Sequence, residues 1–174
     1  MEEYKGVKFK VIPVEEKADA SELLDLDKFI SGFVSVRGAE GNASIRHKEG
    51  FLIKRTGSVM TRLKDEDVVF VQRIDGDVVY ASGGTPSSEA RLHWKIYENR
   101  KDVNIILHFH DREMLDVPFD LEIGPFEYGT PELADAAGRI SVEGDVIKVK
   151  EHGFIVIAES KGGVKELFFR EFRR

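Results

Sequence analysis

The segment Asn104-Ile105-Ile106-Leu107-His108-Phe109-His110 determines the fold and the chemistry expected of this chain. A run of apolar, β-branched residues that leads directly into a His-x-His pair is typical of a buried strand. Residues two apart on a strand point to the same face, so His108 and His110 stand side by side, roughly 7 Å apart at Cα. Phe109 then points into the opposite layer. Both imidazoles could reach one metal ion, although the pattern also fits strand-end histidines that are merely hydrogen-bonded.

A third histidine, His152, opens a second apolar run over residues 153–157. Three imidazole ligands with one open position is an arrangement used by catalytic zinc. The chain contains no cysteine, which excludes disulfides and thiolate metal sites. A metal here must therefore sit on histidine and carboxylate ligands.

Size and composition are those of one globular domain over residues 1–174, with 41% hydrophobic and 33% charged residues. No apolar run approaches the length needed to cross a bilayer, and the charged N-terminus lacks the apolar core of a signal peptide. We therefore expect a cytoplasmic protein. The net charge of −6 argues against a nucleic-acid partner, because phosphate neutralisation needs a dense basic surface.

The polar composition favours a thermophilic source. Gln72 is the only glutamine and asparagine occurs three times, whereas lysine, arginine and glutamate are abundant. This balance is reported for proteins from hot environments.

Periodicity and turn signals divide the chain into short strands and helices. Strands are expected over residues 7–11, 33–36, 51–54, 68–71, 78–80, 104–110, 146–149 and 154–157. Asp75-Gly76 is a strong signal for a hairpin turn. Helices are expected from the N-cap Ser21 to Ile30, over residues 90–98, from Pro131 with Thr130 as N-cap, and from Gly163 onward.

Three segments of small residues could present backbone amides and hydroxyls to an anion. Two are predicted tight turns, 38–46 with Gly41-Asn42 at its centre and Thr56-Gly57-Ser58. The third, residues 83–89, ends in Ser87-Ser88-Glu89 and leads into a helix, whose positive dipole end favours an anion. The structural alternative is that a serine caps this helix and Glu89 complements its dipole.

Considered together, these segments indicate one site. Glu89 is a carboxylate without an evident partner in the sequence, and it stands close along the chain to the proposed anion cradle. A phosphate cradle beside a metal and a base is the equipment for removing a proton next to a carbonyl.

The order of these blocks is specific, although each block is weak alone. They are Gly41-Asn42-x-Ser44-x-Arg46, Thr56-Gly57, Pro86-Ser87-Ser88-Glu89, His93, His108-x-His110 and His152-Gly153. As an ordered set over residues 32–157, they resemble the class II aldolase/adducin family. Within that family the resemblance is to the aldolases of L-fuculose 1-phosphate and L-rhamnulose 1-phosphate.

The resemblance implies an α/β fold, a three-layer α/β/α sandwich with a mixed, mostly antiparallel central sheet, assembled as a homotetramer. By the same resemblance, the metal ligands for Zn²⁺, or another divalent metal, would be His108, His110 and His152. Glu89 would be the acid/base that removes a proton from dihydroxyacetone phosphate. The substrate phosphate would be held by Asn42, Thr56, Gly57, Ser87 and Ser88.

The implied reaction is reversible cleavage of a ketose 1-phosphate to dihydroxyacetone phosphate and a small aldehyde, which makes the protein a carbon–carbon lyase of carbohydrate metabolism. Residues 1–30 depart from the family pattern, and the segment after His110 and the C-terminal tail are shorter. The proton-donating tyrosine of the family has no evident counterpart, and Tyr128 is the candidate substitute. His47 and His93 are expected to be structural, and His93, on the helix after Glu89, either packs in the core or supports a residue of the site.

Two other functions remain open at this stage. Related enzymes use the same metal and phosphate site to dehydrate, epimerise or decarboxylate a sugar phosphate, and the missing tyrosine leaves room for them. The other class is a non-catalytic interaction module like the adducin head domain. Retention of three histidines and Glu89 speaks against such a module, because a buried polar cluster is costly without a use.

Overall fold

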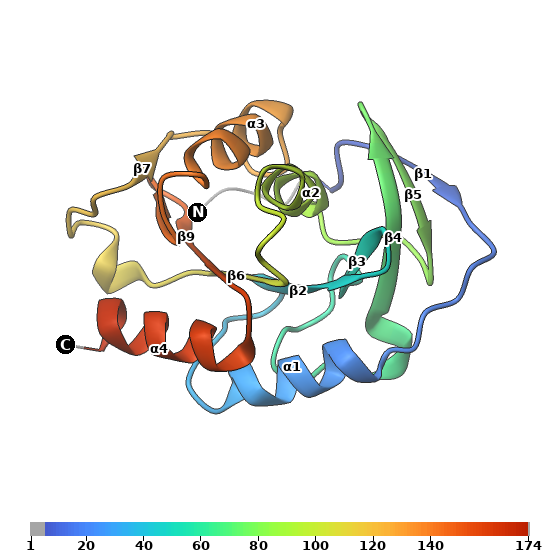
Figure 1. Ribbon diagram of the computed structural model, residues 1–174, viewed down its shortest axis with the longest axis horizontal. Helices are drawn as coiled ribbons and strands as arrows, with labels where there is room; N and C mark the ends of the chain where they lie inside the picture. Colours follow the sequence, from blue (N-terminus) through green and yellow to red (C-terminus); the bar gives the residue numbers. More distant parts are fainter. Residues whose placement is uncertain (1–5, 174) are drawn as a thin grey trace.

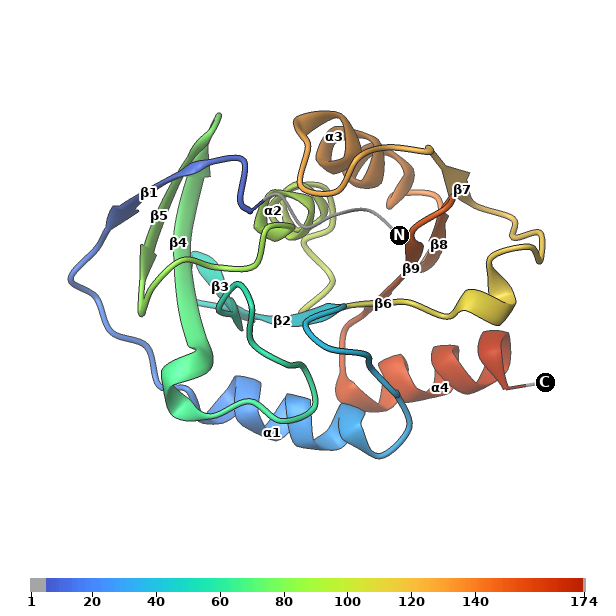
Figure 2. The ribbon, with the colours of Figure 1, turned by 180° about the vertical axis from the view of Figure 1, so that it is seen from behind.

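The computed structural model describes residues 6–173, which form a central sheet with a layer of helices on each face. The sheet has nine strands in the order β1-β5-β4-β3-β2-β6-β9-β8-β7. Helices α2 and α3 cover one face, while α1 and α4 cover the other (Figure 1). The view from behind shows the same division (Figure 2). The α/β/α sandwich implied by the family resemblance is therefore confirmed.

The sheet is mixed but mostly antiparallel, as expected. Only the outermost pairs, β1 with β5 and β7 with β8, are parallel among the described strands. The strands are β1 (Lys10–Pro13), β2 (Asn42–His47), β3 (Gly50–Lys54), β4 (Val68–Asp75), β5 (Val78–Ser82), β6 (Ile105–Phe109), β7 (Glu122–Ile123), β8 (Val146–Val149) and β9 (Gly153–Ala158).

Two of the helices begin at a polar residue whose side chain accepts from a free amide, whereas α1 begins after Ala20 and not after the predicted N-cap Ser21. The α-helices are α1 (Ser21–Ser31), α2 (Ala90–Asn99), α3 (Pro131–Ile140) and α4 (Lys161–Phe172), with short 3-10 turns η1 (Asp65–Asp67) and η2 (Arg112–Met114). Thr130 caps α3 as predicted, since its hydroxyl accepts a hydrogen bond from Leu133 N at 3.3 Å. Ser160 caps α4 in the same way, so this helix begins before the predicted Gly163. None of the helices in residues 6–173 is both long and apolar enough to cross a membrane.

Strand β6 shows how side-chain alternation builds two separate cores. Ile106 belongs to the core beneath α2 and α3, whereas Leu107 and Phe109 belong to the core beneath α1 and α4. His108 has the same parity as Ile106 and is fully buried, so its imidazole points to the α2 side of the sheet. Phe109 points to the other side, as the strand pattern predicts.

The prediction of a turn over residues 38–46 was wrong for its second half. Residues Asn42–His47 form β2, which pairs antiparallel with both β3 and β6. The turn ends at Gly41, whose φ of 73° is left-handed. The strand was missed because the buried residues Asn42 and Ser44 hide its alternation, and both are hydrogen-bonded inside the protein.

Two other expected strands also differ. Residues 33–36 contain no strand, because Phe33 and Val34 bury their side chains against α4 from an irregular segment. The N-terminal strand is displaced from residues 7–11 to Lys10–Pro13, where it lies at the sheet edge beside β5. The remaining predicted strands are present within a few residues of their expected positions.

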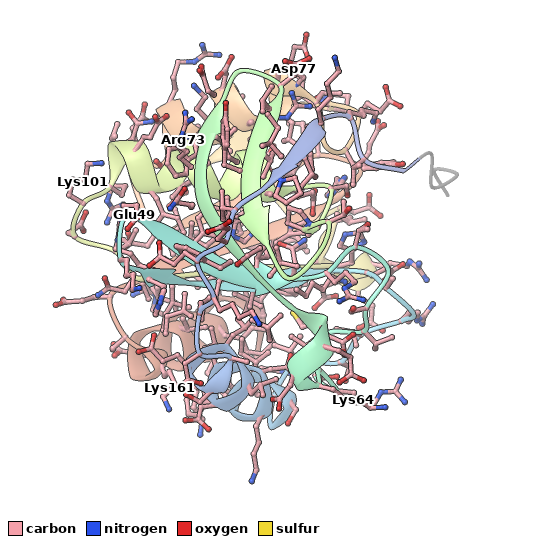
Figure 3. All side chains as sticks on the ribbon, turned by 90° about the vertical axis from the view of Figure 1, so that its right-hand side faces the viewer. Glu49, Lys64, Arg73, Asp77, Lys101 and Lys161 are labelled. Atoms are coloured by element: carbon pink, nitrogen blue, oxygen red, sulfur yellow. The ribbon has the colours of Figure 1, made fainter. Side chains whose placement is uncertain are left out.

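The β4–β5 hairpin is the feature that the sequence predicted most directly. Its turn contains Gly76 with φ of 58°, next to Asp77. Figure 3 shows Asp77 at the tip of this hairpin, at the far end from Lys64, which precedes η1. The hairpin and β1 together form one end of the sheet.

Candidate active site

The three predicted metal ligands meet where β6 ends and β9 begins. These strands are antiparallel neighbours, with His108 opposite Ile155 and Phe109 opposite Phe154. The residue after β6 and the residue before β9 therefore come together. The Nε2 atom of His108 lies 3.2 Å from that of His110 and 3.1 Å from that of His152.

The tautomer of His108 is fixed by the main chain. Its Nδ1 lies 3.0 Å from the carbonyl oxygen of Phe154, which can only accept a hydrogen bond. Nδ1 therefore carries the proton, and burial lowers the pKa of His108 to about 3, so the ring is neutral. A neutral imidazole in this tautomer presents the lone pair of Nε2, which is the state required of a metal ligand.

The donor set fits a divalent metal. All three candidate ligand atoms lie within 4.8 Å of one another. Nitrogen ligands about 2.05 Å from a tetrahedral zinc ion are about 3.3 Å apart, close to the two Nε2 separations measured here. Burial also lowers the pKa of His110, which keeps its ring neutral near pH 7.

Glu89 stands directly beside this cluster. Its Oε2 lies 3.1 Å from His108 Nε2, and its Oε1 lies 2.9 Å from His152 Nε2. Glu89 precedes the first turn of α2 and makes no side-chain cap. The structural alternative is wrong in this respect, because Glu89 itself is the N-cap residue, Ser87 Oγ accepts only from Glu89 N at 3.4 Å among the described residues, and the carboxylate faces the histidines.

A cavity of about 880 Å³ opens next to Glu89. Imidazoles of His110 and His152 line it, whereas His108 lies fully buried behind them. Every residue predicted to hold a phosphate lines the same cavity: Asn42, Thr56, Gly57, Ser87 and Ser88.

Backbone pairing explains why two distant turns share this cavity. Arg55 and Pro86 form an isolated antiparallel bridge, with Thr56 N donating to Thr85 O at 2.9 Å and Ser87 N donating to Lys54 O at 2.9 Å. The end of β3 thereby lies along the segment that leads into α2. Gly57 has φ of 82°, a left-handed conformation that costs glycine little.

The side chain of Asn42 is directed at Glu89. Its Nδ2 donates a hydrogen bond to Glu89 Oε2 at 2.9 Å, and its Oδ1 lies 2.5 Å from His93 Nε2. The sequence predicted a phosphate contact for this residue, and the structure adds a direct contact with the carboxylate. His93 is fully buried behind Asn42, as its expected packing position indicated.

Tyr128, the candidate proton donor, also lines the cavity. The Lys8 ammonium lies 4.0 Å above its ring and donates a hydrogen bond to its carbonyl oxygen at 2.5 Å. The N-terminal segment therefore helps to hold this part of the wall. Arg91 holds the next residue, since its guanidinium donates to Gly129 O at 2.7 Å.

Sequence reasoning missed Lys54 and Glu40, which both line the cavity. Lys54 is 3% exposed and donates to the carbonyl oxygens of Ala39 and Ser58 at 2.6 and 2.7 Å. Burial lowers its pKa to about 8, although the charge of Glu89 opposes this shift. The available signal was a lysine inside an apolar strand, directly before Thr56-Gly57. Glu40 lies 3.9 Å from His110 Nδ1, and nothing in its local sequence pointed to that contact.

Residues 21–117 match the sequence model of a family described as Class II Aldolase and Adducin N-terminal domain. The chain belongs to the class II aldolase and adducin family. Among curated relatives, L-fuculose phosphate aldolase of Methanococcus maripaludis is 31% identical over 142 residues, covering 71% of this chain and 75% of that protein. The enzyme of the same name from Escherichia coli is 39% identical over 74 residues, covering 42% of this chain and 33% of that protein.

Solved structures of class II aldolases share the fold. An L-fuculose 1-phosphate aldolase superposes with a TM-score of 0.71 at 23% identity, covering 86% of this chain and 81% of that chain. The L-fuculose-1-phosphate aldolase of Thermus thermophilus gives a TM-score of 0.61 at 19% identity, covering 87% and 92%. Together with the sequence matches, these make the chain an enzyme of the class II aldolase type, a carbon–carbon lyase.

Proposed function

We propose that this class II aldolase reversibly cleaves a ketose 1-phosphate, similar to fuculose 1-phosphate, to dihydroxyacetone phosphate and a small aldehyde, with zinc as its metal. The observation that carries the proposal is the position of Glu89. Its carboxylate lies 2.9 to 3.1 Å from two of three clustered imidazoles and opens onto the cavity lined by the small-residue turns. A base, a metal ligand set and an anion cradle therefore face one space.

The metal ligands would be His108, His110 and His152, which also form the group that could hold an ion among the described residues. A divalent ion held there supplies Lewis-acid stabilisation of the negative charge that develops on the substrate oxygens. The protein contributes the neutral state of His108, which the Phe154 carbonyl and burial maintain.

Glu89 removes the proton from the carbon beside the substrate carbonyl and returns it in the reverse direction. Burial raises the pKa of Glu89, but the contact with His152 and the hydrogen bond from Asn42 lower it by more, so the pKa lies well below its usual value. Glu89 is therefore a carboxylate at neutral pH, which is the form that accepts a proton.

The phosphate is held where the two turns meet. Thr56, Ser87 and Ser88 bring hydroxyl groups to the cavity wall, and Gly57 lies beside them. Lys54 adds a buried positive charge at the base of these turns. A phosphate dianion complements this charge, which supports a phosphorylated substrate over a neutral sugar.

The aldehyde half of the site would include Tyr128, which lines the same cavity. Tyr128 is the candidate that protonates the leaving aldehyde, because it is the one tyrosine among the described residues that lines this cavity. We also propose the homotetramer typical of the family. The cytoplasmic location and the thermophilic source expected from the sequence stay predictions.

The test is metal content followed by exchange of the dihydroxyacetone phosphate proton into deuterated water. Exchange needs the metal, Glu89 and the phosphate cradle, so uncertainty about the aldehyde does not affect it. Stoichiometric zinc with exchange supports the proposal and leaves only the aldehyde to be found by screening. Zinc without exchange contradicts aldol chemistry and points to a dehydratase or decarboxylase. No metal after reconstitution contradicts the whole proposal and points to an adducin-like module.

A further inference from the structure

We infer that His93 is a positioning residue, which fixes the direction of the Asn42 amide and thereby holds Glu89 in place as a base. The inference rests on the proposed function of Glu89. It comes from an unbroken chain of side-chain hydrogen bonds that runs from the far side of α2 into the active site. Every member is at most 5% exposed: Tyr97, Ser44, His93, Asn42 and Glu89.

The contacts in this chain are short and continuous. Tyr97 Oη lies 2.8 Å from Ser44 Oγ, which lies 2.6 Å from His93 Nδ1. His93 Nε2 lies 2.5 Å from Asn42 Oδ1, and Asn42 Nδ2 lies 2.9 Å from Glu89 Oε2. Glu89, His93 and Tyr97 are spaced four residues apart at the start of α2 and along it, Asn42 and Ser44 lie on one face of β2, and the packing of α2 on β2 joins the two sets.

Glu89, at the end of this series of hydrogen bonds, determines which group donates and which accepts in each bond. A carboxylate can only accept hydrogen bonds, so Asn42 must turn its NH₂ group toward Glu89. The amide oxygen then faces His93, which must carry its proton on Nε2. Burial lowers the pKa of His93 to about 4, although the charge of Glu89 opposes this shift, so the ring is neutral. With the proton on Nε2, Nδ1 can accept a hydrogen bond from the Ser44 hydroxyl.

If every hydrogen bond in the series ran in the opposite direction, Glu89 would be displaced. With the proton of His93 on Nδ1, Asn42 would have to donate to Nε2 and present its oxygen to the carboxylate. Two acceptors would then face each other in a buried site, which is unfavourable by the cost of an unmet hydrogen bond. Ser44 prevents this by supplying its hydroxyl proton to Nδ1, while the Tyr97 hydroxyl, 2.8 Å from Ser44 Oγ, donates to the carbonyl oxygen of Asn104 at 3.1 Å.

The competing interpretation is that the chain only stabilises the core. The His93 ring stacks on Phe51, with centroids 6.1 Å apart and an angle of 24° between the planes. An apolar side chain of similar size could fill this space, and a purely structural His93 would be replaced by it at a cost in stability alone. The two interpretations therefore differ in their effect on the turnover number.

The experiment compares His93→Leu with His93→Gln in the zinc-loaded full chain. Glutamine can donate to Asn42 and accept from Ser44, which keeps the direction of these hydrogen bonds. Leucine can do neither. We expect His93→Leu to lower kcat for proton exchange by tenfold or more with KM and zinc content unchanged, and His93→Gln to recover most of it. Equal losses in both variants, or losses that follow the melting temperature, would overturn the inference.

A spectroscopic measurement on the wild-type protein decides the direction independently of activity. The ¹⁵N shifts of the imidazole distinguish the two neutral tautomers, and we expect the Nε2–H form for His93. The Nδ1–H form would overturn the inference whatever the enzyme does. If the wild-type protein showed Nε2–H but no proton exchange, the proposed reaction would fall while the positioning arrangement would stand.

Discussion

The Oε1 atom of Glu89 lies 2.9 Å from Nε2 of His152. His152 directly precedes β9, and β6 lies between β9 and β2 in the sheet. This contact joins a carboxylate at the start of α2 to one of three clustered imidazoles. Because it places an anion against a metal ligand set and beside a cavity, it explains how one residue can serve as the base.

Replacing the base without changing its shape should separate metal binding from turnover. Glu89→Gln keeps the size of the side chain but cannot take a proton. We expect zinc content to be unchanged and proton exchange to fall by about 10²- to 10⁴-fold, the usual contribution of a positioned acid/base. Substantial exchange in this variant would show that Glu89 is not the base.

Removal of the metal should lower stability as well as activity. A ligand present at 100 times its Kd stabilises the folded state by about 2.7 kcal/mol. For a chain of this length that corresponds to roughly 5 to 11 °C in melting temperature. We expect a chelator to lower the melting temperature by this order, and zinc to restore it.

His110→Ala provides the matched test of the ligand set, since His110 is the most exposed of the three histidines and its loss disturbs the core least. We expect this variant to lose zinc, exchange activity and the effect of the chelator together. Full activity without bound metal would contradict the metal-dependent mechanism.

Removing one hydroxyl from the phosphate cradle should affect binding more than turnover. Ser88 lines the cavity, and Ser88→Ala should raise the KM for a phosphorylated substrate several-fold with kcat little changed. Ser31→Ala is the control, because its hydroxyl is exposed on α1 and bonds only to the carbonyl of Lys28 among the described residues. An unchanged KM in Ser88→Ala would remove this serine from the cradle.

The lowered pKa of Lys54 should make phosphate binding dependent on pH. Burial lowers its pKa to about 8, so the ammonium is charged below pH 8 and neutral above it. We expect the KM for a phosphorylated substrate to rise between pH 7 and 9 in the wild-type enzyme. Lys54→Met should show a higher KM that is flat over this range, whereas Lys101→Met, at an exposed position (Figure 3), should behave as wild type.

The same shift has a consequence for stability. Between pH 8 and the ordinary lysine value of 10.5, the unfolded chain holds a proton on Lys54 that the folded chain has lost. Folding stability from this group therefore rises with pH across that interval. Denaturant unfolding of wild type and Lys54→Met at pH 8 and 10 measures it, and an identical pH dependence in both would place the lysine pKa elsewhere.

The elements with local sequence signals could be predicted without the structure. The alternation in β6 placed His108 and Phe109 on opposite faces, Thr130-Pro131 placed the start of α3, and Asp75-Gly76 placed the hairpin. The ordered blocks also pointed to the family and to the histidine cluster. These features follow from periodicity, capping and turn chemistry, which depend on residues close in the chain.

Tertiary structure alone decided the partners of the buried polar groups. Strand β2 was hidden because Asn42 and Ser44 look like turn residues until His93 and Glu89 are placed beside them. Lys54 ends an expected strand with no sign of a buried role, and only the structure shows the carbonyl groups of Ala39 and Ser58 that accept its hydrogen bonds. The free energy of a buried polar group depends on which donors and acceptors surround it, and here those come from distant parts of the chain.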